Sequence, residues 1–419
     1  MSTAARLPPA DAFTLLDLGT AQTTLTQICL SDGAMRYAGH VRVPSQGMRK
    51  GQVISPPAAA EAIRQAATAL EARTAIPVER VFLSLTGMHV KGVGSQAGAG
   101  LTSRSREVTR EDVRRVLDLA RAITLPEGRQ ILHVIPQEFV LDRQDGIHEP
   151  VGMLASRIEA RVCIITVAAN RKDNLVLAAN HAGLAVEQLI FAPLAAAEAS
   201  LQAQERHAGV AVVDMGAGST GVVVYLHGSL AYVGVIPIGG DHFTSDIAIG
   251  LGTPPADAER IKCDYGGVDP SQVAENSEIE APGAGGQPAQ ALSHRRLCEW
   301  IEPRARELIH LLREELGRSG VASAGAAGPM AGNALGAGLV LSGGGWRLQG
   351  FPELISSELG LPVRIAAPAP LDGMPEELSE PEYAFSVGAC YYAHRLLVRQ
   401  MRPPTMWDKL RQRWESLAD

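Results

Sequence analysis

The sequence predicts an α/β fold built from two related lobes, and three observations support this prediction. An apolar strand that ends at an Asp and a Gly-rich turn occurs twice, at residues 13–30 and at residues 210–225. A third strand, residues 339–342, runs into the glycine triplet Gly343, Gly344 and Gly345. Apolar strands alternate with helical segments between these points, which is typical of layered α/β proteins.

The second hairpin, residues 210–225, carries the clearest chemical signal. Its sequence VAVVDMGAGSTGVVVY places Asp214 at the end of a β-branched strand, with Gly216, Gly218 and Ser219 in the turn that follows. Glycine leaves no Cβ in the way of a ligand, and the N–H groups of such a turn can form an anion nest. An Asp beside a phosphate requires a cation between them, so the pattern indicates a Mg²⁺-nucleotide site. The alternative for this stretch alone is an ordinary hairpin with a Gly-rich turn.

The first hairpin, residues 13–30, repeats this pattern early in the chain. The strand FTLLDL ends in Asp17 and Leu18, and Gly19, Thr20 and Ala21 open the turn before a returning strand. Two such hairpins predict an internal duplication that holds a phosphate between its halves. The triplet at 343–345 adds a third turn, where a nucleotide can lie against bare backbone. A plain turn before a helix is the alternative there.

Composition limits the class of protein. The chain has 419 residues, enough for two or more domains. Its 38 basic and 45 acidic residues give a net charge of −7, which argues against general nucleic-acid binding. The five cysteines are scattered without a C-x-x-C pair, so neither a disulfide framework nor a zinc site is predicted. Without an 18-residue apolar run or a signal-peptide pattern, a cytoplasmic protein is expected.

The segments, taken in order, predict how the chain is divided. Residues 1–11 are expected to be disordered, and a helix over residues 55–73 follows the first hairpin. An α+β subdomain is inserted over residues 87–165, with a helix that opens at a capping box of Thr109 and Asp112 and an extended run broken at Pro136. The first lobe is predicted to consist of residues 12–86, 166–207 and 370–398. The core of the second lobe is predicted to consist of residues 208–240 and 319–369, and its outer part of residues 241–318. A linker is predicted at residues 399–404.

The last segment, residues 405–419, predicts an amphipathic helix. Its apolar residues fall on one helical stripe, which consists of Met406, Trp407, Leu410, Trp414 and Leu417. The basic residues on or beside the other face are Lys409, Arg411 and Arg413. This pattern is typical of a helix that lies in the plane of a membrane surface. A helix docked on the protein's own core or on a partner is the alternative.

Longer motifs in the chain resemble a known family. The combination of LLDLGT, VVDMGAGST and LVLSGGG resembles the actin/Hsp70/sugar-kinase ATPase superfamily. The stretches HVIPQEF, QLIFAPLA, VIPIGGDHFTSDIA and GTPPADAERIK resemble the bacterial cell-division protein family FtsA over most of residues 12–395. The resemblance implies an actin-like two-lobed ATPase fold from a duplicated ribonuclease-H-like unit, with an inserted subdomain and a C-terminal amphipathic helix.

The resemblance also implies roles for single residues at a site for ATP and Mg²⁺. Asp17 and Asp214 would hold Mg²⁺, largely through water. Residues implied to cradle the phosphates or lie near the ribose are Gly19, Thr20, Ala21, Gly216, Gly218, Ser219, Gly239 and Gly240. Those implied to contact the ribose and the base are Glu259, Lys262, Gly343, Gly344 and Gly345. A solvated helix face is the alternative for Glu259 and Lys262.

Two departures from the wider superfamily bear on hydrolysis. Many relatives carry an acidic residue two positions after the Thr of the second hairpin, in the vicinity where this chain has Gly221 and Val222. Many also carry an acidic residue or Gln before the Pro of the connecting segment, where this chain has Ala192 before Pro193. Phosphoryl transfer depends mostly on positioning and charge stabilisation. We therefore expect ATP binding with weak or negligible hydrolysis.

The function that the resemblance implies is a tether for the division ring. The implied partners are the C-terminal peptide of the tubulin-like FtsZ on the second lobe, later divisome proteins on the inserted subdomain, further copies of the chain in filaments, and the inner face of the cytoplasmic membrane at midcell. The alternatives are an actin-like adaptor of type IV pilus assembly, whose function would not require the membrane-seeking tail, and a sugar-kinase-like enzyme. The enzyme would need a catalytic Asp at a sugar pocket, for which the sequence offers no candidate.

Overall fold

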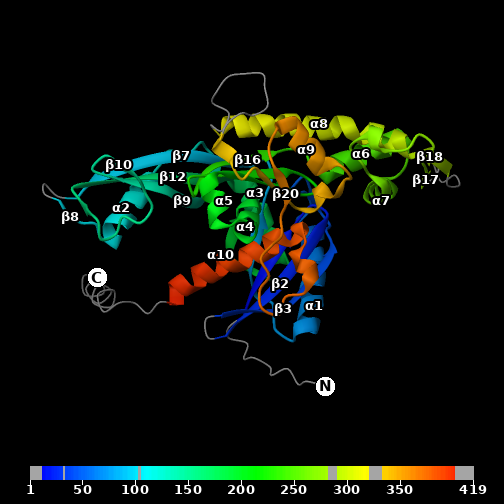
Figure 1. Cartoon of the computed structure of the whole chain (residues 1–419). Coiled ribbons are helices and arrows are strands. Elements are labelled where there is room, and N and C mark those ends of the chain that lie inside the picture. Colours follow the sequence, from blue (N-terminus) through cyan, green and yellow to red (C-terminus); the bar gives the residue numbers. More distant parts are fainter. Residues whose placement is uncertain (1–11, 32–33, 102–104, 282–289, 320–332, 402–419) are drawn as a thin grey trace.

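Two five-stranded sheets with the same topology form the centre of the protein (Figure 1). The computed structural model describes residues 12–31, 34–101, 105–281, 290–319 and 333–401. The first sheet has the order β13-β6-β1-β2-β3, from strands β1 (Ala12–Leu18), β2 (Gln22–Ser31), β3 (Ala34–Pro44), β6 (Arg80–Leu85) and β13 (Ala185–Phe191). The second has the order β16-β15-β14-β19-β20, from strands β14 (Val210–Met215), β15 (Thr220–Leu226), β16 (Ser229–Ile236), β19 (Leu339–Ser342) and β20 (Val363–Ile365).

Strand directions repeat between the two sheets as well as strand order. In each sheet the first hairpin is antiparallel and continues to a third antiparallel strand. On its other side, the hairpin's first strand pairs in parallel with a strand from much later in the chain. The predicted duplicated α/β fold is therefore confirmed.

Helices cover both faces of the first sheet because its residues alternate between the faces. Leu16 and Leu83 pack with α1 (Pro56–Thr74) and α3 (Ala169–His181), whereas Leu15 and Phe82 pack with α4 (Ala192–Ser200) and α10 (Ala384–Met401). The second sheet packs against helices from the outer part of its lobe, namely α6 (Gly240–Leu251), α7 (Pro255–Tyr265), α8 (His294–Arg318) and α9 (Phe351–Leu359). A short helix, α5 (Ala203–Ala208), precedes β14.

The inserted subdomain projects sideways from the lobes with a sheet and core of its own (Figure 1). Its sheet has the order β10-β9-β12-β7, from β7 (Val90–Gly100), β9 (Arg129–Leu141), β10 (Gln144–Ile147) and β12 (Arg157–Ala168). The helix α2 (Arg110–Arg121) packs on it and begins at the predicted capping box, in which Thr109 and Asp112 bond reciprocally. The shorter strands of the chain are β4 (Met48–Arg49), β5 (Gln52–Val53), β8 (Arg106–Glu107), β11 (Leu154–Ala155), β17 (Glu278–Ala281) and β18 (Gln290–Ser293).

Pro136 does not break the extended run, so that prediction was wrong. Strand β9 continues through it, and the pairing with β12 shifts register between Glu138 and Pro136. Proline donates no hydrogen bond, and a bulge is the usual way for a strand to accommodate it. The residue skipped in the register, Gln137, donates from Nε2 to the carbonyl of Leu230 over 2.8 Å. The bulge therefore joins the inserted subdomain to the second lobe.

The helices α4 and α10 cross at very short range. A Cβ on Gly388 would lie 1.7 Å from the carbonyl oxygen of Ala195, so only glycine permits this crossing. Helix α10 continues to Met401, three residues into the segment predicted as a linker. The predicted disordered start, residues 1–11, and the predicted helix, residues 405–419, lie outside the described residues.

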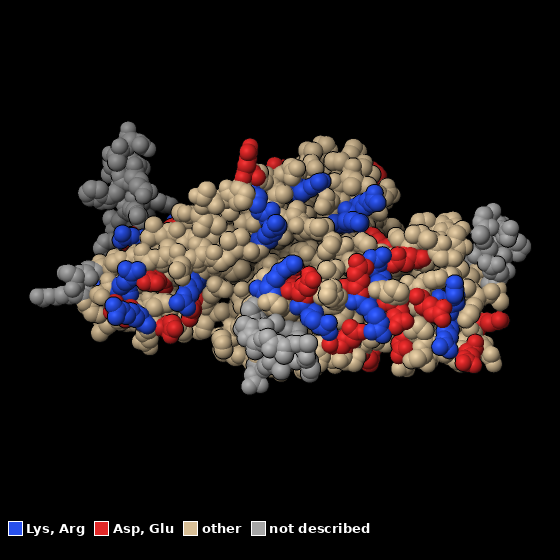
Figure 2. Space-filling model, turned by 90° about the horizontal axis from the view of Figure 1, so that it is seen from above, with Lys and Arg blue, Asp and Glu red and all other residues tan. Residues whose placement is uncertain are grey.

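Charges of both signs are interspersed on the face that carries α8 (Figure 2). On this helix Arg296 pairs with Glu299, and Arg306 with Glu302. Exposed pairs of this kind contribute at most about 1 kcal/mol each. Among the residues that the structure describes, no helix is long and apolar enough to span a membrane.

Candidate functional site

The two predicted metal-binding residues occupy equivalent positions in the two sheets. Asp17 and Asp214 each stand one residue before the end of a central strand, opposite Thr24 and Gly221 of the returning strand. The hydroxyl of a serine on the neighbouring parallel strand lowers the pKa of each carboxyl group, Ser84 in the first lobe and Ser342 in the second. The sequence analysis missed these serines, although the duplication extends to them.

The two carboxylates repel each other. Loss of surrounding water raises the pKa of Asp17 to about 6. The Ser84 hydroxyl and the positive charge of Arg42 lower this pKa by smaller amounts. Loss of water is also the main cause that raises the pKa of Asp214 to about 6, with the Ser342 hydroxyl opposing the rise and the charge of Asp17 adding to it. Two like charges in such surroundings favour a proton or a cation between them.

The tips of the two hairpins meet at a third turn, between β4 and β5. The Thr20 hydroxyl accepts a hydrogen bond from the N–H of Gly51 over 2.9 Å. A Cβ on Gly218 would lie 2.6 Å from both the Thr20 Oγ1 and the Lys50 Cα, so the second hairpin fits against the first only without a side chain there. Gly19 closes its own turn by donating to the carbonyl of Gln22.

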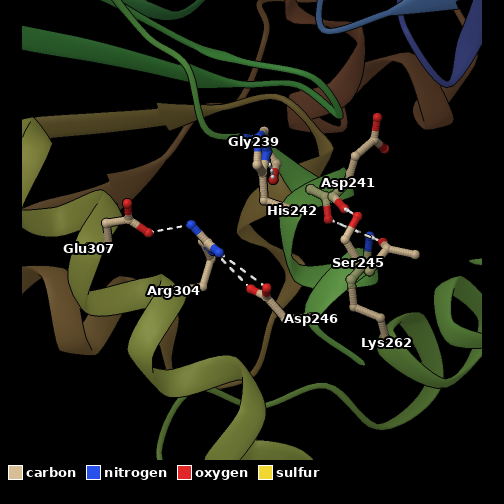
Figure 3. Close-up of polar contacts among 10 residues, drawn as sticks. Gly239, Asp241, His242, Ser245, Asp246, Lys262, Arg304 and Glu307 are labelled. Atoms are coloured by element: carbon tan, nitrogen blue, oxygen red, sulfur yellow. Dashed lines mark hydrogen bonds and ion pairs between the residues drawn. The ribbon is translucent and has the colours of Figure 1, made fainter. Parts of the chain in front are cut away.

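The second hairpin also caps α6. The N–H groups of Gly240 and Asp241 donate to the carbonyls of Gly216 and Ala217, over 3.1 and 2.8 Å. A Cβ on Gly239 would lie 2.5 Å from the Ala217 oxygen. Figure 3 shows His242 turned back onto Gly239, whose N–H donates to its Nδ1. The predicted residues Gly239 and Gly240 therefore lie directly against the second hairpin.

Lys262 joins α7 to the start of α6. Its ammonium donates to the Gly240 carbonyl over 3.2 Å and to the Thr244 hydroxyl over 2.9 Å, and it pairs with Glu259 (Figure 3 shows the approach to α6). The Lys262 side chain is 11% exposed, whereas that of Glu259 is 48% exposed. Lys262 is thus buried in a polar cluster beside the second hairpin, and Glu259 lies at its solvent edge.

The glycine triplet lies beside Asp214. Gly343 adopts a φ of +85°, and a Cβ there would come within 2.3 Å of the Met215 oxygen and 3.1 Å of the Asp214 Oδ1. A Cβ on Gly345 would overlap the Met215 side chain. Gly344 is exposed. The fold therefore brings all three predicted Gly-containing turns to the ends of the central strands.

An ion-pair cluster that the sequence analysis missed connects the two lobes. Glu382 pairs with Arg42 of β3 over 2.6 Å and with Arg347, just after the glycine triplet, over 3.4 Å. Glu382 lies immediately before α10, so three distant parts of the sequence meet here. No local pattern relates these residues.

Packing explains one departure that the sequence analysis noted. A Cβ on Gly221 would lie 2.1 Å from the Pro193 Cγ, because the start of α4 rests directly on β15. An acidic side chain has no room at position 221. Ala192 is also buried, 5% exposed, and offers no polar group to the site.

Solved structures identify the class of fold. The chain is similar to a structure described as the "PilM-PilN type IV pilus biogenesis complex", with a TM-score of 0.64, 18% identity, and 92% of this chain and 99% of the other covered. It is also similar to MreB5 of Spiroplasma citri bound to ADP, with a TM-score of 0.53, 13% identity, and 94% and 100% covered. The protein has the two-lobed actin-like ATPase fold with an inserted subdomain.

Sequence comparison then identifies the family. The family described as "Cell division protein FtsA" matches residues 211–388, and the "SHS2 domain inserted in FTSA" matches residues 87–166. Cell division protein FtsA of Escherichia coli K12 is 36% identical over 386 residues, covering 90% of this chain and 89% of its own. The Bacillus subtilis protein of the same name is 30% identical, with 92% and 84% covered. The chain belongs to the FtsA family of cell-division proteins.

Proposed function

We propose that the protein binds Mg²⁺-ATP between its lobes and tethers FtsZ filaments to the inner face of the cytoplasmic membrane at the division site. The observation that supports this most directly is the pair of equivalent carboxylates, Asp17 and Asp214, each at the end of a duplicated hairpin. Membership of the FtsA family supports the cell-division role. Solved MreB5 structures with ADP and with AMPPNP are similar in fold, which supports the nucleotide.

The residues present fit Mg²⁺ held together with phosphates. The charge of Asp17 raises the proton affinity of the Asp214 carboxylate, and a divalent cation between the two would relieve that repulsion. No cluster of three or more acidic, His or Cys ligands occurs among the described residues. The other ligands would be water and phosphate oxygens, as is usual for Mg²⁺. The bound ion would neutralise phosphate charge, and the glycine turns would let the phosphates approach the backbone.

We expect hydrolysis of ATP to be slow. Neither Gly221 nor Ala192 can orient a water molecule, and Pro193 leaves no room for a side chain at position 221. Steady-state turnover should therefore stay well below about one per second, which is the low end for typical enzymes. Release of inorganic phosphate from purified protein with Mg²⁺-ATP measures this. Turnover near one per second that disappears in Asp214→Asn would contradict it.

We propose that the FtsZ C-terminal peptide binds where α6 meets α8. Ile249 is 81% exposed there, and the Trp300 ring packs against Gly250, where a Cβ would lie only 2.7 Å away. The guanidinium of Arg296 lies 5.8 Å from the centre of the Trp300 ring. An exposed aliphatic residue beside an aromatic ring and a cation suits a short peptide with apolar and acidic groups.

Ile249→Asp is expected to weaken co-sedimentation with FtsZ filaments about tenfold, because it places a charge in the apolar contact. Nucleotide binding should not change, since Ile249 lies at the far end of α6 from Gly240. Leu154→Asp is the matched control, because Leu154 is 69% exposed on the inserted subdomain, which we assign to later divisome proteins. Equal losses in the two variants, or no loss in Ile249→Asp, would contradict this site.

The same assay separates the tether from its alternatives. If the protein is a tether, FtsZ should co-sediment with liposomes only when the protein is present, and this co-sedimentation should require residues 405–419. A pilus adaptor, suggested by the PilM-PilN fold likeness, would show no FtsZ-dependent co-sedimentation. A sugar-kinase-like enzyme would instead show a phosphorylated small-molecule product. Self-association into filaments with ATP is measured by the same sedimentation without lipid.

A further inference from the structure

The turn between β4 and β5 has a backbone conformation that its sequence does not favour. Lys50 and Gly51 form its two central residues, with φ values of 51° and 70°. A two-residue hairpin turn with both φ values positive strongly prefers Asn-Gly, and the left-handed region is unfavourable for a Lys. Such strain persists when the surrounding structure imposes it, and it is concentrated at functional sites.

The surrounding structure holds this turn firmly against the site. The N–H groups of Ile54 and Ser55 both donate to the Gly47 carbonyl, which closes the hairpin's base. Gly51 is buried, and a Cβ there would contact the Thr86 oxygen at 3.3 Å and the Gly87 Cα at 3.4 Å. Lys50 is therefore presented from a rigid support in the first lobe.

The turn touches both hairpins at once. The Gly51 N–H donates to the Thr20 hydroxyl of the first hairpin. The Lys50 Cα packs so closely on Gly218 of the second hairpin that a Cβ on Gly218 would overlap it. In the proposed site, the base lies toward α7 and the glycine triplet. The meeting point of the hairpin tips is then the place for the phosphate farthest from the base.

The charge of Lys50 also supports a phosphate site where the hairpin tips meet. Lys50 is exposed, and no residue that the structure describes pairs with its ammonium or bonds to it. Two other cations near the site are already engaged, Arg42 with Glu382 and Lys262 with Glu259. After burial, the charge of Lys50 is the largest cause of the lowered pKa of His242, so the ammonium lies close enough to act on the start of α6.

We propose that the Lys50–Gly51 turn is a third phosphate-binding element, in which the Lys50 ammonium contacts the terminal phosphate and makes the protein prefer ATP to ADP. This inference rests on the proposed nucleotide site. An ammonium is a strong donor to phosphate oxygens, and a contact with the γ-phosphate alone contributes to ATP and not to ADP. Lys50 is a binding and specificity residue here, and it takes no part in proton transfer.

The decisive variant is Lys50→Asn, because Asn suits the left-handed turn and removes the charge. Its thermal midpoint without nucleotide should equal or exceed that of the unaltered protein. Its affinity for Mg²⁺-ATP, measured by isothermal titration calorimetry, should fall about tenfold or more, while its affinity for Mg²⁺-ADP changes by less than about twofold. Lys50→Arg keeps the charge and should recover most of the preference for ATP.

Other outcomes would overturn the assignment. Equal losses for ATP and ADP would show that Lys50 does not distinguish the terminal phosphate. Unchanged affinity for both in Lys50→Asn would show that the turn is only structural. If the unaltered protein binds neither nucleotide, the proposed nucleotide function fails and this inference fails with it. Binding of both nucleotides without an effect of Lys50 removes this inference alone.

Discussion

Asp214→Asn is expected to stabilise the nucleotide-free protein at pH 7.5 while abolishing its Mg²⁺-dependent affinity for ATP. The carboxylate of Asp214 is ionised at this pH in surroundings that raise its pKa to about 6, so its charge destabilises the folded state. The usual pKa of an Asp is about 4, and a shift of about two units corresponds to at most about 3 kcal/mol. The amide keeps the shape of the side chain, but it carries no negative charge with which to hold a cation.

The pH dependence of stability tests the same point. The folded state binds the proton more tightly than the unfolded state, so the free energy of unfolding should fall as pH rises from about 4 to about 6. Asp214→Asn should remove a large part of this fall in urea titrations without nucleotide. Asp246→Asn is the control, because Asp246 is paired with Arg304 over 2.8 Å and gains nothing from losing its charge. A less stable Asp214→Asn protein at pH 7.5 would contradict the argument.

In the presence of Mg²⁺ and ATP, the unaltered protein should be more stable than Asp214→Asn. The unaltered protein should gain thermal stability with Mg²⁺-ATP, by an amount that grows with ligand concentration above the dissociation constant. Asp214→Asn should gain almost none. Asp214 would then destabilise the nucleotide-free protein and at the same time be required for binding, which is a common property of ligand sites.

The parts of the site that repeat in the sequence could be predicted from it. Asp17 and Asp214 stand at equivalent positions because each ends an apolar strand before a Gly-containing turn, a pattern visible within a few residues. The same local signal predicted the glycine triplet beside Asp214. Because the two sheets share one topology, each hairpin occupies the same position in its own sheet, and the strand ends that carry Asp17 and Asp214 are equivalent.

The parts that depend on distant partners could not be predicted. Glu382 pairs with Arg42, which is 340 residues away in the sequence, and with Arg347 of the other lobe, and nothing in its neighbours in sequence indicates this. Ser84 and Ser342 come beside the carboxylates through parallel pairing between strands far apart in the chain. Pro136 was interpreted as a strand breaker because the bulge opposite Arg161 and Val162 depends on the partner strand.

Trp407→Glu together with Trp414→Glu is expected to abolish co-sedimentation of the protein with liposomes. Each Trp can bury about 150–250 Å², worth a few kcal/mol as an upper estimate. Residues 399–419 contain five basic and three acidic residues, and each basic residue near an anionic surface adds about 1 kcal/mol. Replacing both Trp with Glu removes the apolar term and cancels the net positive charge of this segment, so binding should fall more than about 100-fold.

Three controls make this test specific to the membrane. Trp407→Phe with Trp414→Phe keeps an apolar stripe and should retain most binding, whereas Arg411→Gln should weaken binding to anionic liposomes and leave binding to neutral ones unchanged. The Glu variant should still bind FtsZ and ATP, because the contacts we assign to them lie within residues 12–401. Unchanged sedimentation of the Glu variant would contradict the membrane tether. It would instead favour a tail that docks on the protein's own core or on a partner, since such a helix does not need the lipid surface.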